Sequence, residues 1–103
     1  MKAANAHRGE ASLVVAGETL LLRPSFEALV AAESELGPLF ALVERASEGR
    51  MSLSNIAALF DHLSVGRPEA ISRAMIGEAV VERGLEAVSP VLKLILGQIL
   101  QGR

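Results

Sequence analysis

Polar and apolar residues alternate near the start of the chain, and this period of two predicts a β-hairpin. Residues 10–16 and 19–23 are the expected strands, joined through Gly17 and Glu18, where glycine suits the first position of a type II′ turn. Such a turn would place Val14 opposite Leu21 in the antiparallel ladder. The second face is then polar around this pair, and the first is apolar throughout: Ala11, Leu13, Val15, Leu20 and Leu22. Because an isolated hairpin is marginally stable in water, we expect helices to cover the apolar face.

After Pro24, apolar residues recur every three or four positions, which is the spacing of amphipathic helices. Serines precede several of these segments as N-caps, and glycines follow them as stops. The fourth helix begins at either Pro68 or Ser72, and the last at either Glu86 or Ser89. The expected helices cover residues 26–36, 38–47, 52–63, 72–83 and 86–101. The inward stripe of the first helix is predicted to be Phe26, Leu29, Val30 and Leu36.

Strands followed by helices, without alternation, indicate an α+β fold: an N-terminal two-stranded antiparallel hairpin, then four to five short helices in one compact domain. With 103 residues the chain is long enough for one core, and we assign residues 8–103 to a single domain and residues 1–7 to a disordered N-terminus. The start lacks the apolar run of a secretory signal, and the apolar stretch at residues 88–100 is too short to cross a membrane. We therefore expect a cytoplasmic protein.

Composition argues against catalysis and against nucleic-acid binding. There are 10 basic and 12 acidic residues, no cysteine and two histidines. Asp61 and His62 are adjacent, so on a helix their side chains project about 100° apart and do not form a pair of metal ligands. We expect both side chains to lie on a solvated helix surface. A helix-turn-helix would need a basic recognition helix, but Arg73 and Arg83 are balanced by two glutamates. The sequence predicts no catalytic residues, no cofactor and no metal, and hence no enzyme.

The sequence contains more apolar residues than the inward faces of the predicted hairpin and helices require. Single exposed apolar residues are ordinary on any protein, but a contiguous patch marks self-association or capture of an apolar helix. The candidate protein-binding residues lie outside the inward stripes of the hairpin, the fourth helix and the last helix. They are Val14, Leu21, Val81, Leu94 and Leu100.

One junction motif resembles a known family. Arg8-Gly9-Glu10 precedes the hairpin, and the run Arg23-Pro24-Ser25-Phe26-Glu27-Ala28-Leu29 joins it to the first helix, with Glu33 four residues before Gly37 and with Gly49 and Gly84 as later breaks. This pattern resembles the small tail proteins of gene transfer agents, which are classed with phage tail assembly chaperones, over about residues 8–100. Residues 61–70 depart from it, since they lack the aromatic and glycine-rich stretch often found there.

The resemblance implies a non-enzymatic tail assembly chaperone that keeps the tape-measure protein soluble in the cytoplasm of a bacterial host and is absent from finished particles. Its implied partners are the tape-measure protein and the tail-tube protein. The surplus apolar surface adds further copies of the chain as a candidate partner, and the charge and hydropathy predict no nucleic acid and no membrane. Two alternatives remain open. One is a structural tail component, either a tube or a completion subunit, and the less favoured one is a small DNA-binding regulator.

Overall fold

The hairpin and the helices expected from the periodicity are all present, and the fold is α+β. The structure is a computed structural model that describes residues 10–102. Its elements in chain order are β1 (Ala11–Val15), β2 (Glu18–Leu22), α1 (Phe26–Leu36), α2 (Leu39–Ser47), α3 (Leu53–Leu63), β3 (Ser64–Val65), α4 (Arg73–Arg83) and α5 (Leu85–Gln101). The predicted disordered segment, residues 1–7, lies outside the described residues, and the domain boundary at residue 8 stays a prediction.

The hairpin turn lies one residue earlier than predicted, which changes the strand register. Ala16 and Gly17 both have positive φ, 50° and 80°, so the turn has the backbone of a type I′ hairpin. Val14 therefore pairs with Thr19, and Leu21 with Ser12, so the predicted Val14–Leu21 pair is wrong. The faces are nevertheless as predicted, because a register change of two residues keeps every side chain on its side of the sheet.

This turn makes a testable prediction about stability. Alanine is strained at positive φ, whereas Asn-Gly is the favoured type I′ pair. We expect Ala16→Asn to raise the free energy of unfolding by about 0.5–1 kcal/mol. Gly17→Ala should lower it by about 1 kcal/mol through backbone strain alone, since an added Cβ there meets no atom within 4 Å. Thermal denaturation followed by circular dichroism measures both, and a stabilising Gly17→Ala change would contradict the assigned turn.

A short third strand, β3, completes the sheet in the order β1-β2-β3. It pairs antiparallel with the end of β2, so that Leu21 faces Val65. The Arg23 backbone N–H then donates to the Leu63 carbonyl at 2.8 Å, which continues the contact between the two segments. The sequence did not predict β3, because two residues are too few to show an alternating pattern.

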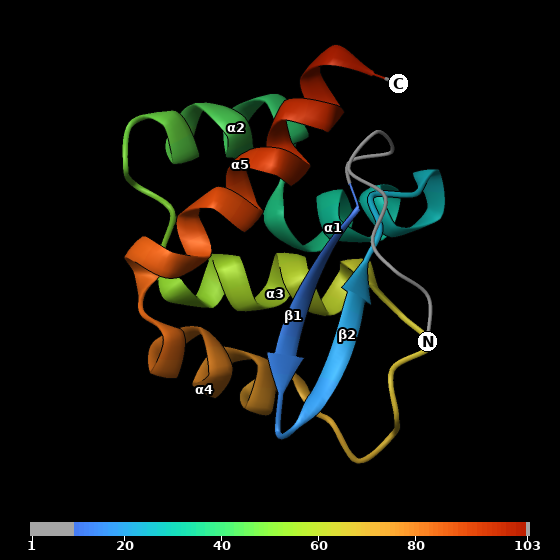
Figure 1. The fold of residues 1–103 in the computed structure, drawn as a ribbon. Coiled ribbons are helices and arrows are strands. Elements are labelled where there is room, and N and C mark those ends of the chain that lie inside the picture. The colour runs from blue at the N-terminus through green and yellow to red at the C-terminus, as the bar shows by residue number, and fades with distance from the viewer. Residues whose placement is uncertain (1–9, 103) are drawn as a thin grey trace.

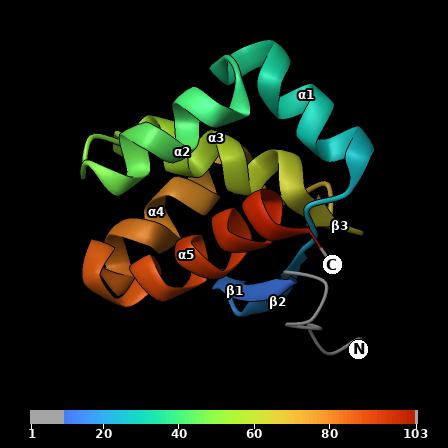
Figure 2. The ribbon, with the colours of Figure 1, turned by 90° about the horizontal axis from the view of Figure 1, so that it is seen from above.

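Helix α3 lies at the centre of the molecule. In Figure 1 it lies below α2 and α5 and above α4, and Figure 2 shows the hairpin and α1 on opposite sides of it. Phe60 in α3 is fully buried and is the largest buried side chain among the described residues. The core around it is otherwise aliphatic. Its α3 members are Ile56, Ala57, Ala58, Leu59 and Leu63.

The helices begin and end close to the predicted residues, but the buried face of α1 differs. Ser25 caps α1 by accepting from the Ala28 N–H, and Ser72 caps α4, which decides between the two predicted starts of that helix. The buried residue of α1 is Ala32, whereas the predicted inward residues Phe26 and Val30 are exposed. The inward stripe was therefore wrong in part: Leu29 and Leu36 pack against the core as predicted, but Ala28 and Ala32 complete the inward face in place of Phe26 and Val30.

Helix α5 begins at Leu85, earlier than either predicted start, and continues through Pro90. Its apolar face packs on the core as the spacing indicated, with Val88, Ile95 and Leu96 buried. Val91 packs against the same cluster while partly exposed. Among residues 10–102, no helix combines the length and the apolar character that crossing a bilayer requires.

Candidate protein-binding surface

The outer sheet face, which points away from the helices, carries two of the five predicted binding residues. Val14 is 47% exposed, and Leu21 is half-buried on the same face. They lie diagonally, because each is opposite a polar residue of the other strand. Leu21 also has Val65 of β3 as its cross-strand partner, and Val65 is exposed. The outer sheet face therefore has an apolar centre of Val14, Leu21 and Val65, and the sequence had missed Val65 together with its strand.

Leu100 lies in a groove between α2 and α5. Two hollows of about 290 and 280 Å³ open between these helices, and Val43 and Leu100 line both of them, so they form one continuous depression, here called the α2–α5 groove. The first hollow is lined by Glu33, Pro38, Leu39, Phe40, Val43, Ile99 and Leu100. The second is lined by Val43, Ala46, Ser47, Ser89, Leu92, Lys93, Leu96, Gly97 and Leu100.

Phe40 is the residue of this groove that sequence reasoning missed. It lies in the first turn of α2 and is 78% exposed. The available signal was its direction on the helix, since at 100° per residue Phe40 projects about 100° from Leu39 and about 160° from Leu42. An aromatic side chain that projects into solvent beside an apolar groove is typical of a contact surface.

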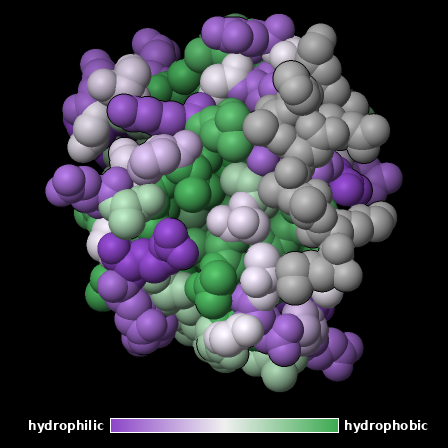
Figure 3. Space-filling view, viewed as in Figure 1, coloured by the Kyte–Doolittle hydropathy of each residue, from purple (hydrophilic) through white to green (hydrophobic). Residues whose placement is uncertain are grey.

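The remaining two predicted residues lie elsewhere. Val81 is exposed in the second half of α4, and Leu94 is exposed on α5 but is not among the residues that line the groove. Leu94 and Leu100 are six positions apart, so they point about 120° away from each other around the helix. Figure 3 shows apolar side chains gathered over α5 and continuing toward β1. The predicted residues therefore belong to at least two separate surfaces.

A cluster of charged side chains joins α1, α3 and α4 on another part of the molecule. Arg73 Nη2 donates to Glu35 Oε1 at 2.9 Å, and Arg73 Nε donates to Asp61 Oδ2 at 2.9 Å. Arg67 also pairs with Asp61, and His62 Nε2 lies 2.8 Å from Glu35 Oε1. Asp61 and His62 are partly exposed, with side chains 16% and 20% exposed, and each is bonded to a side chain from another part of the chain.

These contacts shift the pKa values of the cluster. Hydrogen bonds from Arg73 and then from His62 lower the pKa of Glu35 to about 2. Burial opposes ionisation of Asp61, but the hydrogen bonds from Arg67 and Arg73 outweigh it and lower the pKa of Asp61 below its ordinary value. The pKa of Arg73 rises because it donates to Glu35 and Asp61.

The cluster is suited to fastening helices rather than to chemistry. Its carboxylates are held ionised by guanidinium groups, so neither is a proton acceptor of useful strength near neutral pH. Within residues 10–102, no three His, Cys, Asp or Glu side chains converge to hold a metal ion. The partners of Glu35 and Asp61 come from other elements, which is why adjacency in the sequence did not reveal them.

Comparison with known proteins relates this fold to the tails of bacterial viruses. The family model described as phage tail tube protein, GTA-gp10, matches residues 8–102. The chain belongs to this family. No curated protein and no solved structure matches it.

Membership in the GTA-gp10 family confirms the predicted connection to gene transfer agent and phage tails. The match includes the hairpin and all five helices, so it applies to the whole described fold. The family description names a tail tube protein and not an assembly chaperone, and a tail tube is a structural assembly. The outer sheet face and the α2–α5 groove are therefore candidate surfaces for contacts with other tail proteins.

Proposed function

We propose that this protein is a structural component of a phage-like tail and acts through protein contacts alone. The observation that carries the proposal is the family match over residues 8–102, whose description is a tail tube protein. A subunit of this kind assembles from the host cytoplasm and stays in the finished particle. It needs surfaces that bind neighbouring subunits, and it needs no reactive groups.

The distribution of exposed apolar side chains supports this proposal. A subunit inside a polymer contacts neighbours on more than one side, so it needs more than one contact surface. The hairpin and α2 lie on opposite sides of the molecule in Figure 2, and each contributes to an apolar surface. The outer sheet face would contact one neighbour, and the α2–α5 groove would contact another.

The second candidate is the tail assembly chaperone that the junction motif implied. Exposed apolar residues on helices outside the groove, Val81 and Leu94, favour it, because they could cover an apolar stripe of the tape-measure protein. A chaperone releases its client before the tail is complete. The two candidates therefore differ in whether the chain is retained in particles.

Mass spectrometry of purified particles tests the proposal. We expect the chain at many copies per particle, in fixed proportion to a major tail protein measured in the same sample. A chaperone would instead be found in the host lysate and be depleted from particles. Depletion of the chain from particles relative to that tail protein would overturn the structural proposal in favour of the chaperone.

Substitutions on the outer sheet face test the proposed contact. Val14→Asp places a charge at the apolar centre of that face and should reduce incorporation into particles by at least about tenfold, because a buried unpaired charge is costly. Ser12→Asp is the matched control, since Ser12 is exposed on the same face of the same strand and is already polar. Equal incorporation of the two variants would show that the apolar centre is not the contact.

A further inference from the structure

We infer that two copies of this chain associate through the α2–α5 groove about a twofold axis. The inference does not depend on whether the protein stays in the tail, because a tube subunit and a chaperone could each form such a pair. It rests on the shape and the charge of the groove, whose two ends are complementary to each other.

The groove has a projecting side chain at one end and a hollow lined by small side chains at the other. Phe40 projects at the end that contains Leu39 and Ile99. At the other end, Ala46, Ser47, Ser89 and Gly97 are among the lining residues. A Cβ added to Gly97 would meet no atom within 4 Å, so open space lies above this glycine.

A twofold axis through the middle of the groove exchanges these ends. Val43 and Leu100, which line both hollows, mark the middle. Rotation by a half turn there places the Phe40 ring of each copy over the small-residue hollow of the other. In an isologous interface both copies use the same surface, so that surface must be complementary to itself. A projection on one side of the axis and a hollow on the other side meet that requirement.

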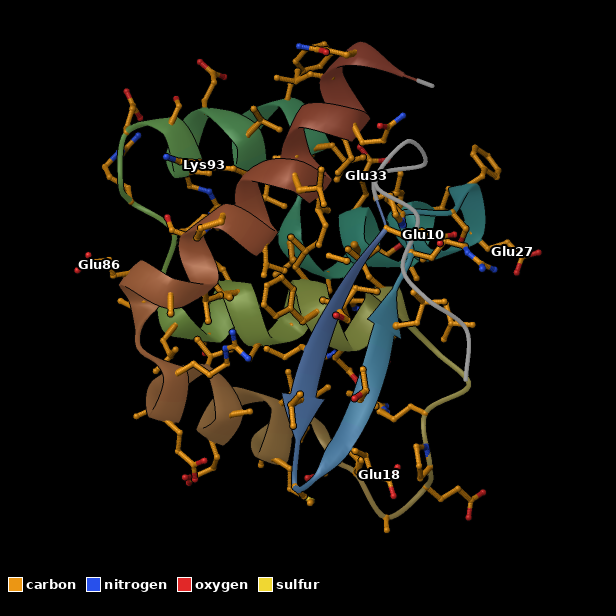
Figure 4. The ribbon with its side chains drawn as sticks, viewed as in Figure 1. Glu10, Glu18, Glu27, Glu33, Glu86 and Lys93 are labelled. Carbon is orange, nitrogen blue, oxygen red and sulfur yellow. The ribbon has the colours of Figure 1, made fainter. Side chains whose placement is uncertain are left out.

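The charges are arranged in the same way. Glu33, whose Oε2 accepts a hydrogen bond from the Leu39 N–H at 3.0 Å, lines the Phe40 end, and Lys93 lines the other end. Figure 4 shows the two side chains apart, on either side of α5. Lys93 makes no ion pair with any residue in 10–102. The same half turn brings Lys93 of each copy toward Glu33 of the other, so that two intermolecular ion pairs frame an apolar centre.

This complementarity favours a second copy over a foreign helix as the occupant. A foreign apolar helix could fill the groove, but it would have to supply a cation and an anion at the correct spacing, together with a cover for Phe40. A second copy supplies all three. Burial of an aromatic ring of this size contributes strongly to association, and it occurs twice in the pair. Because the groove is small compared with a standard interface, we expect a dissociation constant on the order of 10 μM.

Sedimentation velocity on the full chain, from about 1 to 500 μM, tests the inference. The wild type should pass from monomer to dimer over this range. Phe40→Ser should raise the dissociation constant by at least roughly tenfold. Phe26→Ser is the matched control, since Phe26 is also in the first turn of its helix and is 82% exposed, and it should leave the dimer unchanged. Circular dichroism checks that each variant is folded.

Two further variants test the geometry. Gly97→Leu fills the hollow without meeting the protein's own atoms and improves helix propensity, so it should block the dimer while leaving the monomer stable. Lys93→Glu should weaken the dimer, and combining it with Glu33→Lys should restore it, because the exchange recreates both ion pairs.

A wild type that is monomeric at about 500 μM would overturn the inference, as would equal effects of the two phenylalanine substitutions. A dimer that tolerates Gly97→Leu, or a charge exchange that restores nothing while the fold is intact, would also overturn it. If the chain is monomeric and Phe40→Ser abolishes binding of the tape-measure protein, the groove holds a foreign helix instead. Neither result changes whether the chain is found in particles, so the proposed function is tested separately.

Discussion

Replacing Phe60 with alanine is expected to lower the free energy of unfolding by about 3–5 kcal/mol. Phe60 lies on the central helix α3 with none of its surface exposed, and its ring is surrounded by aliphatic side chains from the hairpin and the other helices. Truncation would remove buried apolar surface and leave a cavity that packed helices cannot close. A loss of this size is a large part of the total stability of a domain, typically about 5–15 kcal/mol.

Urea denaturation followed by circular dichroism at 222 nm measures the effect, since the chain has no tryptophan for fluorescence. Phe26→Ala is the matched control, because the same atoms are removed from a ring that is 82% exposed, and its cost should stay within about 0.5 kcal/mol. Phe60→Leu keeps most of the side-chain volume and should lower the free energy of unfolding by about 1–2 kcal/mol. This variant should remain folded even if Phe60→Ala does not. Equal costs for the two alanine variants would contradict the placement of α3.

Replacing Arg73 with glutamine should have the second largest effect, a loss of about 1–2 kcal/mol at neutral pH. Within residues 10–102, Arg73 is the side chain that pairs with both Glu35 of α1 and Asp61 of α3. Asp61 keeps Arg67 as a partner but loses one of two charge-assisted hydrogen bonds. The magnitude is modest because Arg73 and Glu35 are each about 40% exposed, and solvent screens their attraction.

The effect should depend on pH in a defined direction. The pKa of Glu35 falls from 4.5 to about 2 on folding, so the stabilisation from this carboxylate is complete above pH 4.5 and is lost as the pH falls through about 2. Asp61 contributes in the same direction. The difference in urea midpoint between wild type and Arg73→Gln should therefore be largest near neutral pH and should shrink toward about pH 2.

Arg83→Gln provides the control for charge alone. Arg83 is an exposed arginine of the same helix and makes no ion pair among the residues that the structure describes. Its replacement should change stability by less than about 0.5 kcal/mol at any of these pH values. Added salt should reduce the cost of Arg73→Gln and leave that of Arg83→Gln unchanged. A cost for Arg73→Gln that does not vary with pH would contradict a role in holding ionised carboxylates.

The sequence by itself determined the features that depend on near neighbours. Alternation showed which hairpin residues face inward, and this survived the wrong register because the error was an even number of residues. Ser25 and Ser52 marked helix starts because a serine cap bonds an amide only three residues ahead. The motif between the hairpin and the first helix, which is also local, correctly indicated the tail family.

The tertiary structure alone decided the features that depend on distant residues. The two-residue strand β3 exists because α3 ends beside β2, and the Arg73 contacts exist because three helices converge there. The exposed position of Phe26 follows from which face of α1 packs on the core, where Ala32 is fully buried. The α2–α5 groove belongs to the same class, since only packing shows that Phe40 and Leu100 line one depression. Periodicity reports which face of a helix is apolar, but contacts between elements determine what covers that face and what leaves it open.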